Sequence, residues 1–273
     1  MRAHRPLWLL ALVASGCGPQ RGPDVIYLAS AADVVARMLA AAGVHAGDVV
    51  YDLGCGDGRI VIAAARERGA RGVCVDIDTS RIAASQRNAE AAGVRERIEF
   101  RHADMFETDL ATATVVALYL SPALNERLRP KLLREVRPGA RIVSHNFGMG
   151  DWRADSVITV AWPTGTTSVV NAWVLPADVA GTWELGAPGD RRFRVRFTQH
   201  YQEVGGTASS RGRTVMLSGA RLVGDSIKFR FAERRGGRPA VLRFAGRVSG
   251  AAMAGTVRPD ADSTAGRWQA ARP

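Results

Sequence analysis

One stretch decides the fold class of this chain: VVYDLGCGDGR, residues 49–59. Its apolar start predicts a buried β-strand, and an apolar helical pattern begins at Ile60. Between them, Gly54, Gly56 and Gly58 let the backbone turn sharply and lie close to a ligand. The free N–H groups at the start of the helix would point at that ligand. The stretch therefore predicts a strand–turn–helix unit for a nucleotide-type cofactor, with glycines spaced more tightly than in dinucleotide-binding enzymes.

Polar residues close each of the apolar strands predicted after this one. Asp76 follows residues 72–75, Asp104 follows residues 98–100, Ser121 follows residues 114–120, and His145 ends residues 141–145. Apolar helical patterns separate these strands, which predicts a parallel sheet with helices on both faces. Ligands bind at the carboxyl ends of such strands. The expected fold is therefore α/β and Rossmann-like, with Asp52 and the three later polar residues Asp76, Asp104 and Ser121 along one edge.

Some of the acidic residues near these strand ends also have a structural interpretation. Asp57 and Asp76 could cap the elements that follow them, and capping is the only role expected of Asp78. Thr79 or Ser80 is expected to cap the helix that starts there. The ordered set of acids on one strand–helix–strand frame nevertheless favours cofactor binding over isolated caps.

The cysteines and the composition set further limits. We expect Cys55 and Cys74 to be small packing residues rather than nucleophiles, because no histidine stands in a motif with either. Three cysteines cannot build a disulfide framework. Hydrophobic residues make up 47% of the chain and charged residues 23%, so the chain should fold around a core. It has no apolar run long enough for a multi-span membrane protein.

Two sets of motifs carry a resemblance to known families. Residues 52–58 (DLGCGDG), Val75-Asp76 and Asp104-Met105 resemble the class I S-adenosylmethionine-dependent methyltransferases. Residues 118–125 (LYLSPALN), 129–133 (RPKLL) and 143–152 (VSHNFGMGDW) are similar to a narrower group. That group includes archaeal protein-lysine methyltransferases and the mitochondrial lysine methyltransferases of the ATP synthase c-ring protein and the adenine nucleotide translocase. The resemblance covers residues 24–176 and implies S-adenosyl-L-methionine as cofactor and a protein lysine as methyl acceptor.

The resemblance also implies a role for particular residues. Those expected to bind the cofactor are Tyr27, Asp52, Gly54, Cys55, Gly56, Gly58, Asp76, Ile77, Asp104 and Met105. The first acid and the glycines would hold the methionine end, Asp76 the ribose, and Asp104 with Met105 the adenine. Ser121 and Asn125 are expected to orient the acceptor, and no metal is expected. His145 is an alternative base, although a histidine at a strand end more often has a structural role.

The sequence departs from the group's pattern at its substrate edge. Relatives usually have a proline after the position of Tyr27, where this chain has Leu28-Ala29-Ser30. The group's pattern predicts an acidic residue where Asn146 and Gly148 stand. Both departures concern acceptor recognition more than cofactor binding.

From Gly181 the hydrophobic period changes to two. Phe193, Val195 and Phe197 alternate with arginines, and Gly-rich turns separate such runs. Six to eight short antiparallel strands are expected over residues 180–273, forming a small barrel or sandwich. Residues 181–273 hold 17 basic and 7 acidic side chains, so nearly all of the net charge of +11 lies there. The basic face could be only a solvated surface, or it could bind a membrane surface or nucleic acid. The aromatic residues have the opposite parity and point inward, which disfavours nucleic acid.

The first residues resemble an export signal. Arg2 and Arg5 precede an apolar run at 7–13, and small residues lead to Cys17, as in the lipobox of bacterial lipoproteins. This predicts a leader at 1–17, a tether at 18–23 and membrane association, or a cytoplasmic chain if the leader is not processed. Two other functions stay open: an envelope lipoprotein that uses a methyltransferase-like domain as a binding module, and a small-molecule methyltransferase.

Overall fold

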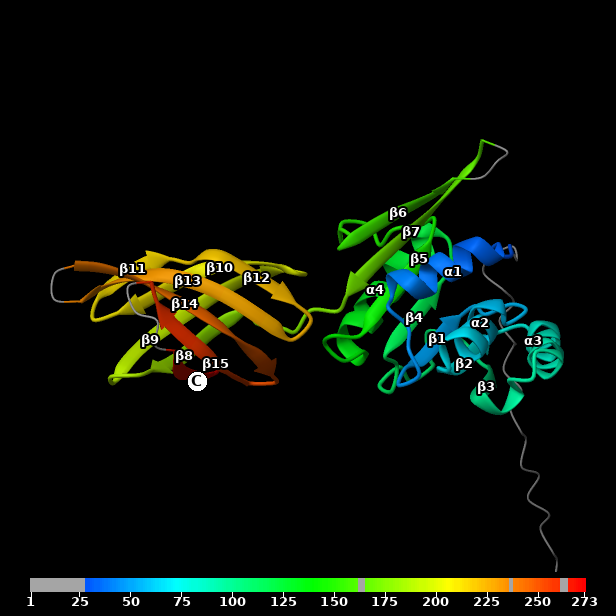
Figure 1. Ribbon diagram of the computed structural model, residues 1–273, viewed down its shortest axis with the longest axis horizontal. Helices are drawn as coiled ribbons and strands as arrows, with labels where there is room; N and C mark the ends of the chain where they lie inside the picture. The colour runs from blue at the N-terminus through cyan, green and yellow to red at the C-terminus, as the bar shows by residue number, and fades with distance from the viewer. Residues whose placement is uncertain (1–27, 162–164, 236–237, 261–264) are drawn as a thin grey trace, which may run out of the picture.

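The computed structural model describes residues 28–161, 165–235, 238–260 and 265–273. The predicted leader at 1–17, the tether at 18–23 and Tyr27 lie outside the described residues. Figure 1 shows an α/β lobe, which contains the N-terminal half of the chain, beside an all-β lobe. The domain boundaries expected from the sequence remain predictions.

The α/β lobe is built on one seven-stranded sheet with the order β3-β2-β1-β4-β5-β7-β6. The strands are β1 (Val49–Leu53), β2 (Arg71–Asp76), β3 (Ile98–His102), β4 (Val115–Leu118), β5 (Arg141–His145), β6 (Ser156–Ala161) and β7 (Thr167–Val174). The first five are parallel, as expected, which confirms the α/β class. The sequence patterns did not predict β6 and β7, which add an antiparallel edge beyond β5.

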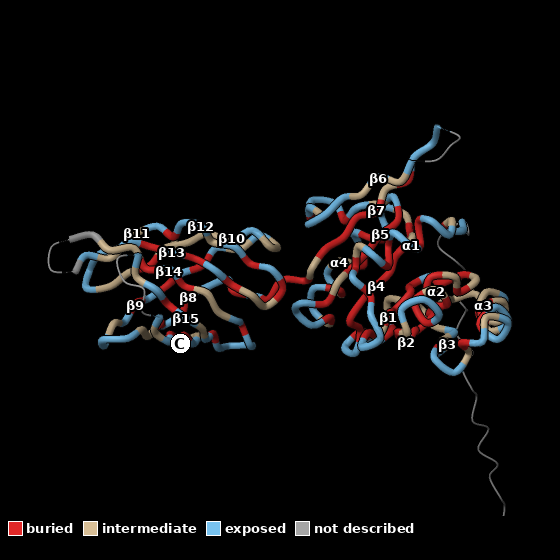
Figure 2. Tube along the Cα trace, viewed as in Figure 1, coloured by how far each residue is buried: buried red, intermediate tan, exposed pale blue. Residues whose placement is uncertain are grey.

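Helices cover both faces of this sheet. They are α1 (Ala32–Ala41), α2 (Arg59–Arg68), α3 (Thr79–Ala91) and α4 (Pro122–Glu135), with a 3₁₀ turn at Arg95–Arg97. Successive β1 residues explain the layering, because Val50 packs with α1 and α2 whereas Tyr51 packs with α4. Figure 2 shows the central strands almost wholly buried. The parallel strands thus present their carboxyl ends as the exposed polar edge of the lobe.

Two helix starts show how local sequence sets the frame. Asp78 is the N-cap of α3, and its carboxylate accepts the Ser80 N–H at 2.8 Å. The expectation that Thr79 or Ser80 caps this helix was therefore wrong by one or two residues. Ser121 is the N-cap of α4, and Pro122 occupies the first helical turn, where its missing N–H costs nothing.

The all-β lobe is one nine-stranded antiparallel sheet with the order β11-β10-β9-β8-β16-β15-β14-β13-β12. Its strands are β8 (Gly181–Ala187), β9 (Arg191–His200), β10 (Glu203–Ser210), β11 (Arg213–Met216), β12 (Ser218–Val223), β13 (Ser226–Arg235), β14 (Arg238–Ser249), β15 (Ala252–Pro259) and β16 (Gly266–Ala271). Leu217, between β11 and β12, donates its N–H to Gly206 of β10 at 2.9 Å, so the two edges meet. The lobe is a nearly closed barrel, with more strands than the six to eight expected.

The barrel confirms the predicted alternation of side chains. Phe193 and Phe197 are buried in one aromatic core, whereas Arg192, Arg194 and Arg196 are exposed. Phe229, Phe231, Phe244 and Trp268 complete that core with ring centroids 4.8–5.7 Å apart in neighbouring pairs. Across the described residues, no helix is long and apolar enough to cross a membrane.

Candidate active site

The glycine turn after β1 has a backbone that side chains would not tolerate. Gly54, Gly56 and Gly58 have φ values of 80°, 56° and 79°. The left-handed region strains any residue with a Cβ. A Cβ on Gly58 would also lie 2.8 Å from the Cβ of Ser85 in α3, and one on Gly54 would lie 3.1 Å from Leu120. The glycines therefore allow the turn to pack against α3 and the end of β4.

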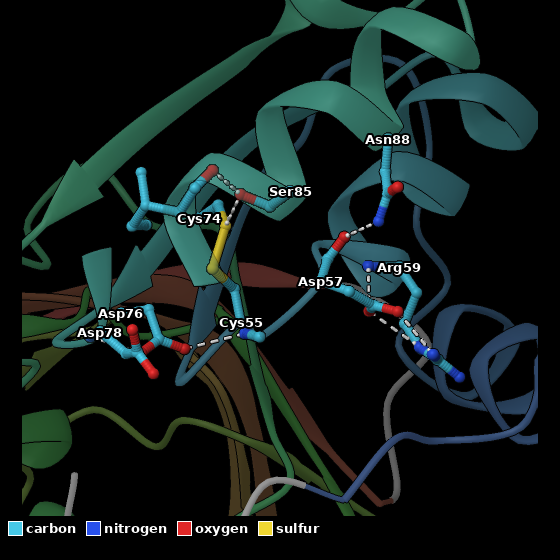
Figure 3. Close-up of a disulfide and its surroundings, with 10 residues drawn as sticks. Cys55, Asp57, Arg59, Cys74, Asp76, Asp78, Ser85 and Asn88 are labelled. Carbon is cyan, nitrogen blue, oxygen red and sulfur yellow. Dashed lines mark hydrogen bonds and ion pairs between the residues drawn. A yellow bond between two sulfur atoms is a disulfide. The ribbon is translucent and has the colours of Figure 1, made fainter. Parts of the chain in front are cut away.

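A disulfide joins this turn to β2, which corrects the expectation for the cysteines (Figure 3). Cys55 and Cys74 are bonded, with their Cα atoms 5.3 Å apart, and both are buried. The N–H groups of Gly54 and Cys55 also donate to the Val75 carbonyl, at 2.8 and 3.1 Å. The two cysteines are neither free packing residues nor nucleophiles, because the turn folds back over the parallel neighbour of its own strand.

Asp52, at the carboxyl end of β1, is a carboxyl group with unusual chemistry. It is 2% exposed, and its Oδ2 atom has no hydrogen-bond partner. Burial raises the pKa of Asp52 to about 8, and the nearby charges of Asp76 and Asp57 contribute to the increase. A buried carboxyl without a partner is costly, so a cationic or hydrogen-bonding ligand group beside it would be favourable.

Asp76, at the end of β2, already holds the glycine turn in place. Its Oδ2 accepts the Gly56 N–H at 2.9 Å and its Oδ1 accepts the Asp78 N–H at 2.9 Å (Figure 3). Since each carboxylate oxygen has two lone pairs, Asp76 can still accept bonds from a ligand. The acid predicted to bind the ribose is thus fixed next to the glycines predicted to bind the methionine end.

The third strand end supplies Asp104 and Met105. Asp104 accepts the Phe106 N–H at 2.8 Å, and Met105 is half-buried against the core of the lobe. Ala103, just before them, donates its N–H to the Asp76 carbonyl at 3.0 Å. The structure therefore brings Asp52, Asp76, Asp104 and the glycines to one edge, together with Ile77.

The opposite end of this edge holds the predicted acceptor residues. Asn125 is fully buried in α4, and its Nδ2 donates to Ser144 Oγ, the Phe147 carbonyl and the Gly148 carbonyl at 3.1–3.2 Å. Its Oδ1 has no partner. Asn125 therefore fixes the segment after β5 with its nitrogen and retains only its oxygen for other contacts, while Ser121 caps α4.

His145 and Ser30 form a link that the sequence did not predict. Ser30 Oγ lies 2.8 Å from His145 Nδ1, and the Ser30 carbonyl accepts Arg59 Nη1 at 2.6 Å. The His145 ring stacks on Tyr119 with centroids 3.9 Å apart. Burial lowers the pKa of His145 to about 4, so the ring is neutral near pH 7. Ser30 thereby connects the helix after the glycine turn to the ends of β4 and β5.

The barrel contacts the segment after β5 through its β9–β10 turn. Gln202 Oε1 accepts the indole N–H of Trp152 at 2.9 Å, and Gln202 Nε2 donates to the Arg153 carbonyl at 2.8 Å. The Tyr201 hydroxyl donates to Asp151 at 3.0 Å, and its ring stacks on Trp152 with centroids 5.4 Å apart. The segment that Asn125 fixes at its start is therefore fixed by the barrel at its end.

Comparison with known proteins shows what this edge is for. A family model described as the ANTKMT methyltransferase domain matches residues 52–156. The chain is 44% identical over 139 residues to a protein-lysine N-methyltransferase of Saccharolobus islandicus, a match that covers 50% of this chain and 86% of that protein. The chain belongs to this methyltransferase family. It is an S-adenosylmethionine-dependent methyltransferase, as the motifs predicted.

Two further relatives support this methyltransferase assignment. An RNA methyltransferase from Salinibacter ruber, solved in complex with S-adenosyl-L-homocysteine, is 46% identical with a TM-score of 0.52. That match covers 56% of this chain and 96% of the solved one. A lysine N-methyltransferase of Mus musculus that is named for an ATP synthase protein is 33% identical over 121 residues, which cover 44% of this chain and 47% of that protein. The methyltransferase's match with these relatives covers about half of its own chain.

The site of the methyltransferase fits its cofactor on structural grounds. The glycine turn leaves no room for side chains, the start of α2 lies directly after it, and the buried Oδ2 of Asp52 lacks a partner for a cationic group. No cluster of three or more His, Cys, Asp or Glu side chains suited to a metal ion occurs in the described ranges. The individual residue assignments remain predictions.

Proposed function

We propose that this methyltransferase transfers a methyl group to the ε-amino nitrogen of a protein lysine. The observation that carries the proposal is its similarity to the Saccharolobus protein-lysine N-methyltransferase across most of that protein. The group resemblance noted in the sequence points the same way. The predicted acceptor side adds neutral surroundings, because His145 is uncharged near pH 7 and Asn125 is an amide.

The reaction asks little acid–base chemistry of the protein. Bound S-adenosylmethionine supplies an electrophilic methyl group on a sulfonium, and its sulfur leaves with the bonding electron pair as a thioether. The acceptor ammonium must first lose a proton to solvent, and a dry, uncharged pocket favours its neutral amine. Asp52, as a carboxylate, would hold the positive methionine end, and Asp76 would hold the ribose. Correct positioning of the amine then supplies much of the rate.

Asn125 would act mainly by shaping the acceptor side. Its nitrogen anchors the Phe147 and Gly148 carbonyls, which keeps the segment after β5 close to α4. Its partnerless Oδ1 could accept a hydrogen bond from an amine. Ser121 would contribute through the start of α4 and the neighbouring Leu120 carbonyl.

We also propose that the enzyme works at a membrane, outside the reducing cytosol. The lipobox-like leader would place Cys17 at the membrane surface. The Cys55–Cys74 disulfide supports the same compartment, because such bonds persist in oxidising surroundings and are rare in the cytosol. Cofactor supply in that compartment is the difficulty, which keeps the envelope binding module as the alternative function.

Calorimetric titration of the full chain with S-adenosylmethionine and S-adenosylhomocysteine tests the cofactor site first. Micromolar binding of both is expected, and Asp76→Ala should weaken it, whereas Asp78→Ala, beside it but assigned only to capping, should not. Absence of binding by a folded chain would favour the binding-module function. An equal affinity in both variants would overturn the ribose assignment.

Transfer of a labelled methyl group then identifies the acceptor. The purified c-ring protein of ATP synthase, a lysine-bearing membrane protein, is the first probe, and its fully dimethylated form is the control. A structured RNA is the second probe, because the Salinibacter relative is described as an RNA methyltransferase. Label on the lysine supports the proposal, and label on the RNA alone would overturn it.

A further inference from the structure

The strands β13 to β16 present a strongly basic outer face of the barrel. Antiparallel pairing places Arg230 beside Arg243 and Arg243 beside Arg258, so three guanidinium groups form one row across neighbouring strands. Lys228 and Arg267 project from the same strands on the same outward parity, and all five side chains are exposed. We call this surface, Lys228, Arg230, Arg243, Arg258 and Arg267, the basic face.

This charge is not neutralised within the protein. Among the described residues, Asp260 pairs with Arg243, whereas no ion pair is found for the other four cations of the basic face. Like charges directly opposite each other in a sheet lower stability. Such a row is therefore expected to persist when it contributes to binding an anion.

Composition alone does not account for the basic face. Arginine is the common cation throughout the chain, yet residues 1–180 hold nearly balanced charges, whereas the net charge of +11 is concentrated in the barrel. A general preference for arginine would have raised the charge of both lobes. The excess belongs to the barrel and, within it, forms continuous rows.

The shape of the basic face limits what it can bind. The outward positions between the cations are small, at Ala245, Ala254 and Thr256, and the large aromatic side chains of the described barrel strands point into its core. A surface without exposed rings cannot stack nucleic-acid bases or insert side chains among acyl chains. It fits a broad anionic surface that is contacted by charge alone.

We propose that the basic face binds the anionic head groups of a phospholipid membrane. The lipobox-like leader provides the second reason for this ligand, because one anchor gives weak attachment whereas an anchor plus a basic patch gives stable attachment. Each cation near an anionic membrane strengthens binding about fivefold. Binding through charge alone also weakens as salt is added. This inference does not rest on methyl transfer.

The test compares binding of the full chain to anionic and to neutral vesicles, made of phosphatidylcholine with and without phosphatidylglycerol. The ratio of the two partition coefficients removes the contribution of the apolar leader. The double variant Arg258→Gln/Arg267→Gln should lower this ratio about 25-fold, as two lost cations predict. The matched control, Arg194→Gln/Arg196→Gln, removes the same charge from exposed positions of β9 on another part of the barrel.

The control should keep most of the native ratio, and high salt should remove the preference from the native chain. Equal ratios for the two double variants, or a preference that salt does not change, would overturn the proposal. So would loss of oligonucleotide binding in the first variant while its vesicle binding stays native. Melting curves of the variants confirm that each barrel is folded.

Discussion

The Cys55–Cys74 bond offers the sharpest test of how the cofactor edge is held together. The bond closes a segment with a sequence separation of 19 residues between the glycine turn and β2. Closing a loop of that size removes unfolded-state entropy worth about 3 kcal/mol. Reduction, or Cys74→Ser, should therefore lower the free energy of unfolding of the α/β lobe by about that amount. For a lobe of this size the melting temperature should fall by roughly 6–12 °C.

Differential scanning calorimetry of the chain with and without reductant measures this effect. The Cys17→Ser variant is the appropriate background, since it leaves only the bonded pair of cysteines. The barrel provides an internal reference, because residues 181–273 contain no cysteine and their unfolding should not respond to reductant. Thiol titration of the unfolded sample reports whether the bond was open.

Superimposable melting curves of fully reduced and oxidised samples would refute the reasoning. Cofactor affinity gives a second readout from the same samples. Reduction should weaken binding without abolishing it, because the N–H groups of Gly54 and Cys55 still bond to the Val75 carbonyl. Unchanged affinity together with lower stability would mean that the bond supports folding but not the shape of the turn.

Three further changes test other parts of the site. Since burial raises the folded-state pKa of Asp52 to about 8, stability should fall as pH rises from about 4 to about 8, and Asp52→Asn should flatten that slope in a calorimetric pH series. Gly58→Ala should cost more in urea unfolding than Gly93→Ala; both have a left-handed φ, costing about 1–3 kcal/mol, but of the two only Gly58 has a neighbour within 4 Å of the added Cβ. Gln202→Ala leaves the Trp152 indole unpaired and should cost about 1–3 kcal/mol, measurable by urea unfolding; an unaffected midpoint would contradict it.

The sequence predicted the features that local patterns encode. The glycine turn, the acids at three strand ends and the alternation of Phe and Arg in β9 each depend on residues a few positions apart. Their structures follow from backbone freedom, strand direction and side-chain parity. These signals were enough for the cofactor edge and for the class of both lobes.

The features that were missed depend on contacts between distant segments. The disulfide forms because the turn folds back over β2, and neither cysteine has a local signal for it. Ser30 meets His145 across 115 positions of sequence. β7 is nearly continuous in apolar residues, so its antiparallel pairing with β5 has no period of its own. Only the folded chain specifies these partners.

The contact between Gln202 and Trp152 means that the α/β lobe is not self-sufficient. Trp152 is 1% exposed, and part of its cover is the Tyr201 ring of the barrel. A version of the chain cut after β7 would present a bare indole, and Asp151 would lose the Tyr201 hydroxyl beside the acceptor segment. The barrel is thus a piece of the enzyme's interior supplied from a second fold, and a shortened chain would need new side chains at 151–153 before it could stand alone.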